Sequence, residues 1–181
     1  MIGQLPISLN IGEIEYAINS DYRIGLILMV ALSDPDLSSQ EKAYILVKNL
    51  YCDEMPNELI GEAIKKATWY LDGGKEQKKQ SYKVMDWEQD EAMIFASVNK
   101  IAGKEIRMVE YMHWWTFLGY FNEIGEGLYT NVLSIRQKKA KNKKLEKYER
   151  DFYNDNRSLI DLKTKISKED QELKEKLLKL L

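Results

Sequence analysis

The chain has 181 residues, of which 44% are hydrophobic, and this amount of apolar material fills one ordinary core but is small for two full domains. Four Trp, eleven Tyr and four Phe against three Pro and ten Gly exclude wholesale disorder. The single cysteine cannot form an internal disulfide, and no apolar run reaches the roughly 20 residues that span a bilayer. With no signal-peptide pattern at residues 1–10, we expect a folded protein that stays in the cytoplasm where it is made.

The net charge of −2 hides an uneven distribution along the chain. Residues 1–135 carry 12 Lys and Arg against 20 Asp and Glu, whereas residues 136–181 carry 15 against 9. Such asymmetry is typical of a basic arm that binds nucleic acid or an acidic partner, or of a solvated helical face that lies against an acidic body. We favour the second interpretation and divide the chain into a helical body, 1–135, and a basic amphipathic helical arm, 136–181.

The first 18 residues have a period of two, which predicts a small β-hairpin. Its turn is expected within residues 10–13, where Asn and Gly tolerate positive φ. The apolar positions that define the period are Ile7, Leu9, Ile11, Ile14, Tyr16 and Ile18.

From residue 20 onward the apolar residues follow the period of an α-helix. Ser20 or Asp21 is a plausible N-cap for a first helix that ends near residues 34–35. Ser38 and Glu41 have the spacing of a capping box, which predicts a second helix that stops near Pro56.

Three further helices follow in the pattern. Asn57 is expected to cap the third helix, which Gly73 and Gly74 would end, and residues 86–89 have capping-box spacing for a fourth that runs to Gly103. A fifth helix is predicted from about 107 to 124, and it is apolar nearly all round.

The fifth helix carries an aromatic cluster in which Trp114, Trp115 and Phe117 are the residues of most interest. Burial in the core is the ordinary interpretation for all three. Any Trp left exposed on this helix would be the best anchor for a protein partner.

A sixth helix is predicted to restart at about Leu128 and to enter the basic segment 136–150. Apolar residues beyond it follow a flawed heptad pattern, and this pattern has two interpretations that the sequence leaves open. It is either a coiled-coil seam or a helical arm folded against its own body. The predicted fold class is mainly α, a helical bundle with an N-terminal β-hairpin and a long basic C-terminal helical arm.

The only histidine, His113, lies three residues after Glu110, which is the half-site spacing of carboxylate-bridged di-iron bundles. A second such motif is required, and the chain has no second histidine to supply it. We therefore expect no metal site, no catalytic residues and no cofactor. Asp21, Arg23 and His113 are predicted to be structural polar residues.

The basic residues at the start of the arm form the expected electrostatic contact surface, and they also carry the alternative hypothesis of a nucleic-acid-binding protein. The sequence around these residues matches no recognised nucleic-acid-binding module. They are Arg136, Lys138, Lys139, Lys141, Lys143 and Lys144.

The order of several segments resembles the bacteriophage gene-product-fifteen family over roughly residues 2–160. The sequence HWW-x-F, within residues 112–124, is the part most specific to this family. These segments are INSDYR at 18–23, EAIKKATWYLDGG at 62–74, DWEQD at 86–90, MHWWTFLGYFNEI at 112–124 and SIRQKKAKNKK at 134–144.

The resemblance implies a tail-region protein of siphophages and prophages of Gram-positive bacteria, generally regarded as a tail assembly chaperone. It implies binding of the tape-measure protein in the bacterial host cytoplasm, with the major tail protein and a second copy of this chain as further partners. Physically, a helical body with apolar grooves would cover the apolar stripes of a long helical tape measure before the tail tube encloses them. No membrane association is expected.

Overall fold

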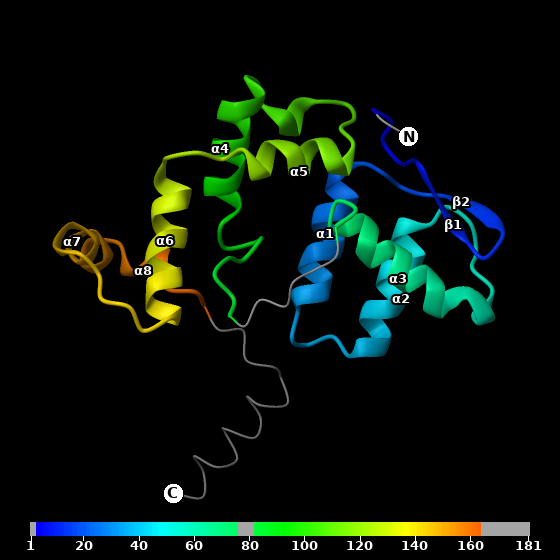
Figure 1. Cartoon of the computed structure of the whole chain (residues 1–181), viewed down its shortest axis with the longest axis horizontal. Helices are drawn as coiled ribbons and strands as arrows, with labels where there is room; N and C mark the ends of the chain where they lie inside the picture. The colour runs from blue at the N-terminus through cyan, green and yellow to red at the C-terminus, as the bar shows by residue number, and fades with distance from the viewer. Residues whose placement is uncertain (1–2, 76–81, 164–181) are drawn as a thin grey trace, which may run out of the picture.

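The computed structural model describes residues 3–75 and 82–163, and it is mainly α with one two-stranded hairpin, which confirms the predicted fold class (Figure 1). The described residues contain no helix that is both long and apolar enough to cross a membrane. The elements are β1 Ser8–Ile11, β2 Ile14–Ala17, α1 Tyr22–Ser33, α2 Ser39–Leu50, η1 Asn57–Leu59, α3 Ile60–Leu71, α4 Glu91–Ala102, η2 Ile106–Met108, α5 Trp114–Asn122, α6 Leu128–Ala140, α7 Lys147–Asp155 and α8 Arg157–Ile160.

The N-terminal hairpin matches its prediction. β1 and β2 pair in antiparallel register with Ile11 opposite Ile14, so only two residues form the turn. Gly12 adopts a φ of 60°, which glycine accepts without strain. Leu9 and Ile11 are buried, and β1 contacts α3. The hairpin therefore closes one side of the core at the N-terminal end.

Three helices, α1 to α3, form the half of the molecule next to the hairpin (Figure 1). Asp21 caps α1 by accepting a hydrogen bond from the Arg23 backbone N–H at 2.9 Å. The capping box between Ser38 and Glu41 that opens α2 is confirmed. The predicted cap at Asn57 is wrong, because a 3-10 turn begins there and α3 starts only at Ile60, without a side-chain cap.

The fourth and fifth predicted helices begin later than expected. Asp86 accepts hydrogen bonds from the backbone N–H groups of Glu88 and Gln89, which fixes a turn, and α4 starts at Glu91. The helix predicted from 107 to 124 is reduced to η2 and α5. Residues 109–113 between them are not helical, and the backbone at His113 pairs with the backbone at Asp21.

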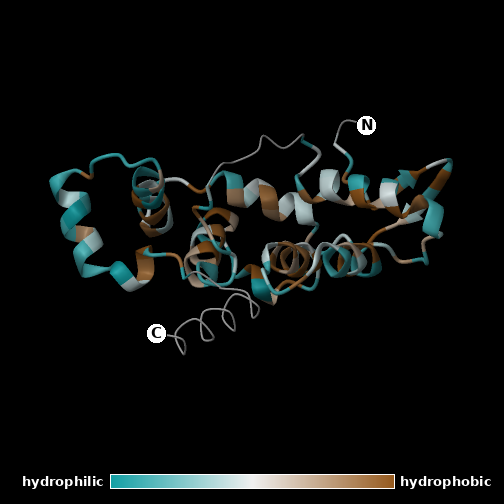
Figure 2. Ribbon diagram, turned by 90° about the horizontal axis from the view of Figure 1, so that it is seen from below, coloured by the Kyte–Doolittle hydropathy of each residue, from teal (hydrophilic) through white to brown (hydrophobic). Residues whose placement is uncertain are grey.

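The helix α5 connects the two halves of the elongated molecule, because it contacts both α1 and α4 (Figure 1). α4 also contacts α6, and α6 contacts α8, so the second half is built outward from α4. Figure 2 shows the same arrangement from below, with the mostly hydrophilic helix α7 at the end away from the hairpin.

The basic segment does not continue as one helix. α6 ends at Ala140, Asn142 takes a positive φ of 52°, and α7 begins at Lys147. The chain then returns to α6 through α8. Over residues 136–163 this corresponds to the folded-back alternative, whereas the heptad positions beyond 163 lie outside the described residues.

Candidate functional site

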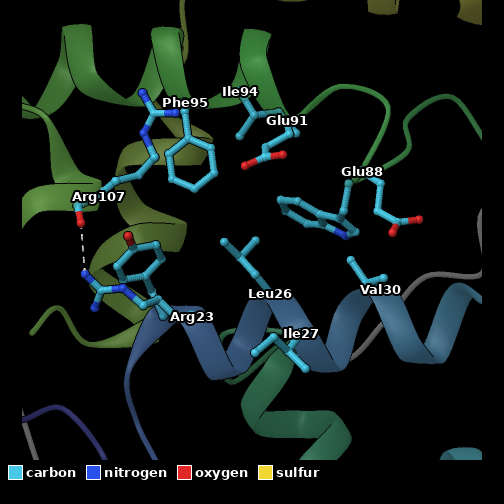
Figure 3. A pocket seen from close by; sticks show the side chains of 11 residues that line it. Arg23, Leu26, Ile27, Val30, Glu88, Glu91, Ile94, Phe95 and Arg107 are labelled. Carbon is cyan, nitrogen blue, oxygen red and sulfur yellow. Dashed lines mark hydrogen bonds between the residues drawn. The ribbon is translucent and has the colours of Figure 1, made fainter.

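An apolar groove lies between α1 and α4 (Figure 3). Its volume is about 450 Å³, within the range of ligand-binding clefts. Apolar side chains from both helices line it together with the loop before α4. The lining residues are Tyr22, Arg23, Leu26, Ile27, Val30, Trp87, Glu88, Glu91, Ile94, Phe95 and Arg107.

The groove exists because α1 and α4 both pack on α5 and hold aromatic rings between them. Tyr22 of α1 stacks on Phe117 of α5 with ring centroids 5.3 Å apart, and Phe95 of α4 lies 6.3 Å from the same ring. The ring centroids of Trp87 and Phe121 are 5.1 Å apart. Aromatic contacts of this kind stabilise the packing beyond the area that they bury. The floor of the groove is thus fixed by the core itself.

Close packing of α1 on α5 depends on Gly25. An added Cβ at this position would lie only 2.3 Å from the indole ring of Trp114. With the inner face of α1 covered in this way, the opposite face remains open, and Ile27 is 55% exposed in the groove. An exposed branched aliphatic side chain beside other apolar residues is typical of a binding surface.

Charged residues lie at the ends of the groove. Arg23 and Arg107 stand at one end, whereas Glu88 lies at the other (Figure 3). Arg23 pairs with Asp21 at 3.1 Å and donates a hydrogen bond to the Arg107 backbone carbonyl at 3.3 Å. Hydrogen bonds from Arg107 lower the pKa of Glu105 to about 2. Both arginines at this end of the groove are therefore paired with carboxylates within the chain.

Asp21 and His113 were predicted to be structural polar residues. They lie at the starts of α1 and α5, and their backbones pair with each other. His113 is buried, and its Nδ1 accepts a hydrogen bond from the Trp115 backbone N–H at 3.0 Å, which caps α5. Its Nε2 lies 2.8 Å from the Pro6 carbonyl oxygen. Burial lowers the pKa of His113. Because Nδ1 accepts this hydrogen bond, the neutral ring carries its proton on Nε2 and donates it in a hydrogen bond to the Pro6 carbonyl.

Glu110 and His113 do not form the half-site considered from the sequence, because both lie before α5 rather than on one helix face. Within residues 3–75 and 82–163, no three His, Cys, Asp or Glu side chains are grouped to hold a metal ion.

The aromatic residues proposed as partner anchors are core residues. Trp114 and Phe117 are fully buried, so neither offers a contact surface. The Trp114 indole N–H donates to the Leu71 carbonyl at 2.9 Å. Trp115 is half-buried and donates to the Tyr70 carbonyl at 2.8 Å. The HWW segment thus caps α5 and locks it against α1 and α3.

Arg136, predicted to be a surface contact, is instead a buried clamp. Its guanidinium forms a two-pronged ion pair with the fully buried Asp90, at 2.6 and 2.9 Å. The remaining N–H groups donate to the carbonyls of Val84, Leu159 and Ile160. All five guanidinium donors are therefore used, and the side chain fixes residues 159–160 to the segment before α4.

Two of the predicted basic contact residues, Lys138 and Lys139, are also occupied within the chain. Lys138 binds the buried Glu149 of α7 at 2.6 Å, and this hydrogen bond lowers the pKa of Glu149. Lys139 pairs with Asp161 and contacts Tyr153. These pairs hold α7 and residue 161 against α6. The remaining predicted basic contacts, Lys141, Lys143 and Lys144, are exposed.

The groove was not predicted from the sequence as a site. Leu26 and Val30 lie on the apolar side of α1, but Phe95 and Trp87, which line the groove with them, come from a distant part of the chain. The available signal was the breadth of the apolar face of α1, which exceeds what one neighbour can cover.

The fold and the groove define a small, mainly helical protein with an open apolar surface between two helices. The family model described as Bacteriophage Gp15 protein matches residues 1–162. The chain belongs to this family of bacteriophage proteins. No curated protein matches it, and no solved structure does.

Proposed function

We propose that this protein is a non-catalytic tail assembly chaperone of a siphophage of Gram-positive bacteria, which binds the tape-measure protein in the host cytoplasm and keeps it soluble during tail morphogenesis. The α1–α4 groove is the observation that carries the proposal. It offers apolar side chains from two helices, and the exposed Ile27 of α1 lies at its edge (Figure 3). The major tail protein and a second copy of this chain are further proposed partners.

The chemistry of the groove favours an amphipathic helix as ligand. Leu26, Ile27 and Val30 follow the spacing of one helix face, and Ile94 and Phe95 provide the opposite wall. A helix laid between them would bury its apolar stripe, while its polar side stayed in water. The charged ends of the groove would add orientation rather than most of the affinity.

Contacts within the chain reduce the support for the alternative of a basic arm that binds nucleic acid. Arg136 is 5% exposed, and the ammonium groups of Lys138 and Lys139 are paired with carboxylates. A phosphate would have to displace these carboxylates before it could contact either lysine.

Co-expression with the tape-measure protein of the same phage tests the proposal. The native chain is expected to keep the tape measure soluble and to co-purify with it. Ile27→Asp is expected to lower the co-purified fraction at least tenfold, because it places a carboxylate in the apolar groove. The matched control is Tyr148→Asp, at a side chain on α7 that is 72% exposed and outside the groove.

Circular dichroism of both variants would verify that each is folded. Equal capture by Ile27→Asp and the native chain would reject the groove as the binding site. A tape measure that aggregates equally with and without the native protein would reject the chaperone function itself.

A further inference from the structure

The side of α2 that faces away from the core carries a stripe with one large exposed aromatic residue. α2 packs against α1 and α3, and its buried side carries Leu46 and Leu50. On the outward side, Tyr44 is 68% exposed in the middle of the helix. Residues separated alternately by four and three positions share a helix face. The outward stripe, which starts just before the N-cap, therefore consists of Leu37, Glu41, Tyr44 and Lys48.

Tyr44 borders two hollows on this surface. One has a volume of about 460 Å³ and lies toward the loop after α2, and the other has about 390 Å³ and lies toward the start of the helix. Since a cavity of about 150 Å³ already holds a benzene ring, either hollow has room for a tyrosine side chain. The stripe and its two hollows form the α2 face. The apolar lining residues other than Tyr44 are Ala43, Val47, Met55 and Ile60 in the larger hollow and Leu37 and Ile45 in the smaller one.

The charges of the stripe make it complementary to itself. Glu41 and Lys48 lie about 5 Å along the helix on either side of the point midway between residues 44 and 45. An antiparallel copy of the same helix, related by a two-fold axis through that point, places each Glu41 opposite the other copy's Lys48. A parallel copy in register would place like charges opposite each other.

Both charged groups are able to form a second ion pair. Within the described residues, the capping box uses only Oε2 of Glu41, at 2.8 Å from the Ser38 backbone nitrogen, which leaves Oε1 for a cation. Lys48 lies 4.0 Å from Glu54, whose side chain is 97% exposed, and a pair of this kind in water holds the ammonium group only weakly. The charges would select the direction of a helix pair, whereas Tyr44 and the hollows would supply the apolar contact.

We propose that two copies of this chain pair through their α2 faces, with the two helices antiparallel and each Tyr44 in a hollow of the other copy. Such an interface is isologous, because the same surface serves both copies. A projecting ring beside its own hollow, and an acid and a base at equal distances from one point, are what a two-fold pair requires. An unrelated helix needs neither. One helix face per copy gives a small interface, so the expected dimer has an affinity in the micromolar range.

The hollows of the α2 face and the α1–α4 groove have no lining residue in common. A dimer through α2 therefore carries two grooves, and two sites that bind one long tape measure raise its apparent affinity. This consequence rests on the proposed function, in which a second copy of the chain is a partner. The pairing itself is a property of the isolated protein and is tested without the tape measure.

Sedimentation equilibrium of the full chain from about 1 to about 200 μM tests the pairing. The native chain is expected to change from monomer to dimer within this range. Tyr44→Asp is expected to raise the dissociation constant of the dimer about tenfold or more, because a carboxylate replaces the anchoring ring. Tyr148→Asp on α7, at a side chain that is 72% exposed and outside both hollows, is the matched control and should dimerise like the native chain.

Charge reversal tests the antiparallel direction. Lys48→Glu places two carboxylates opposite each other and should weaken the dimer severalfold, whereas Glu41→Lys combined with Lys48→Glu restores opposite charges and should recover most of the loss. Lys66→Glu, at an exposed position on α3, controls for the change in net charge. Circular dichroism of each variant verifies the helix content, since Glu41→Lys removes the capping box.

A native chain that stays monomeric up to the highest concentration would overturn the proposal and leave the α2 face to a different partner. Equal dimerisation of Tyr44→Asp and the native chain would overturn it as well, since the dimer would then form elsewhere. A double charge variant that dimerises no better than Lys48→Glu would refute the antiparallel arrangement. Ile27→Asp, which is outside both hollows, should dimerise normally even where it fails to capture the tape measure, so the two proposals fail separately.

Discussion

The contact between Gly25 and Trp114 gives the sharpest test of the packing. In an open helix position, Gly→Ala stabilises a protein by about 1 kcal/mol. At Gly25 the new Cβ would lie 2.3, 2.4 and 2.9 Å from three indole atoms, so the ring would have to move by about 1 Å to restore ordinary contact at 3.4 Å. Overpacking of this kind costs about 1–3 kcal/mol, occasionally more.

Trp114 cannot move freely, because its indole N–H donates to the Leu71 carbonyl at 2.9 Å and its ring stacks on Phe117 at 5.5 Å. Loss of that hydrogen bond adds about 1 kcal/mol to the cost. We therefore expect Gly25→Ala to lower the free energy of unfolding by about 3 kcal/mol in total, measured by urea denaturation with far-UV circular dichroism.

Gly119→Ala is the matched control, because Gly119 lies in α5 with no atom within 4 Å of its added Cβ. It should be neutral or stabilising by up to about 1 kcal/mol. Trp114→Phe, which replaces the indole by a smaller phenyl ring, should reduce the cost of Gly25→Ala in the double variant. A Gly25→Ala variant as stable as the native protein, or strictly additive effects in the double variant, would refute the assigned contact.

Three further predictions concern polar groups and the surface. Arg136→Met should lower the free energy of unfolding by about 3–5 kcal/mol because it leaves Asp90 buried without its cation, and Arg136→Met with Asp90→Leu should recover much of the loss in urea denaturation. The lowered pKa of His113 means that the unfolded state binds more protons just below pH 6.5; stability should be constant above that pH and fall as the pH drops toward the folded-state pKa. His113→Asn, which keeps an N-cap oxygen, should abolish this part of the pH dependence, and an unchanged slope would contradict the assignment. Lys141→Glu should change stability by less than about 0.5 kcal/mol, because the residue is exposed, and a larger loss in thermal unfolding would show that its contact with the Tyr82 ring matters.

Local signals were sufficient for much of the fold. The period of two at residues 7–18 gave the hairpin, and the spacing of Ser38 and Glu41 gave the start of α2. Gly103, with a φ of 67°, ends α4 as expected. These features depend on residues within one turn or one strand pair, so their chemistry is present in the sequence itself.

Features that depend on distant residues were not predictable in the same way. The apolar stretch at 107–124 has the composition of a helix, yet residues 109–113 are not helical, because the backbone N–H of Trp114 donates to the Ser20 carbonyl and the backbone N–H of Tyr22 donates to the Met112 carbonyl. Likewise, Arg136 looks like one of many surface cations until its pairing with Asp90, 46 residues away, is known. The α1–α4 groove needs the same long-range information.

The Arg136 clamp determines where the chain can be shortened. Removal of all residues from 136 onward would appear to separate a basic arm from a complete body, but it would leave Asp90 buried without a cation and take Leu159 and Ile160 from the fold. Such a fragment is expected to aggregate, and its failure to bind a partner would say nothing about the arm. A chain that ends after residue 163 keeps every contact of the clamp. Position 163, rather than 135, is therefore the boundary at which deletion experiments on this protein become interpretable.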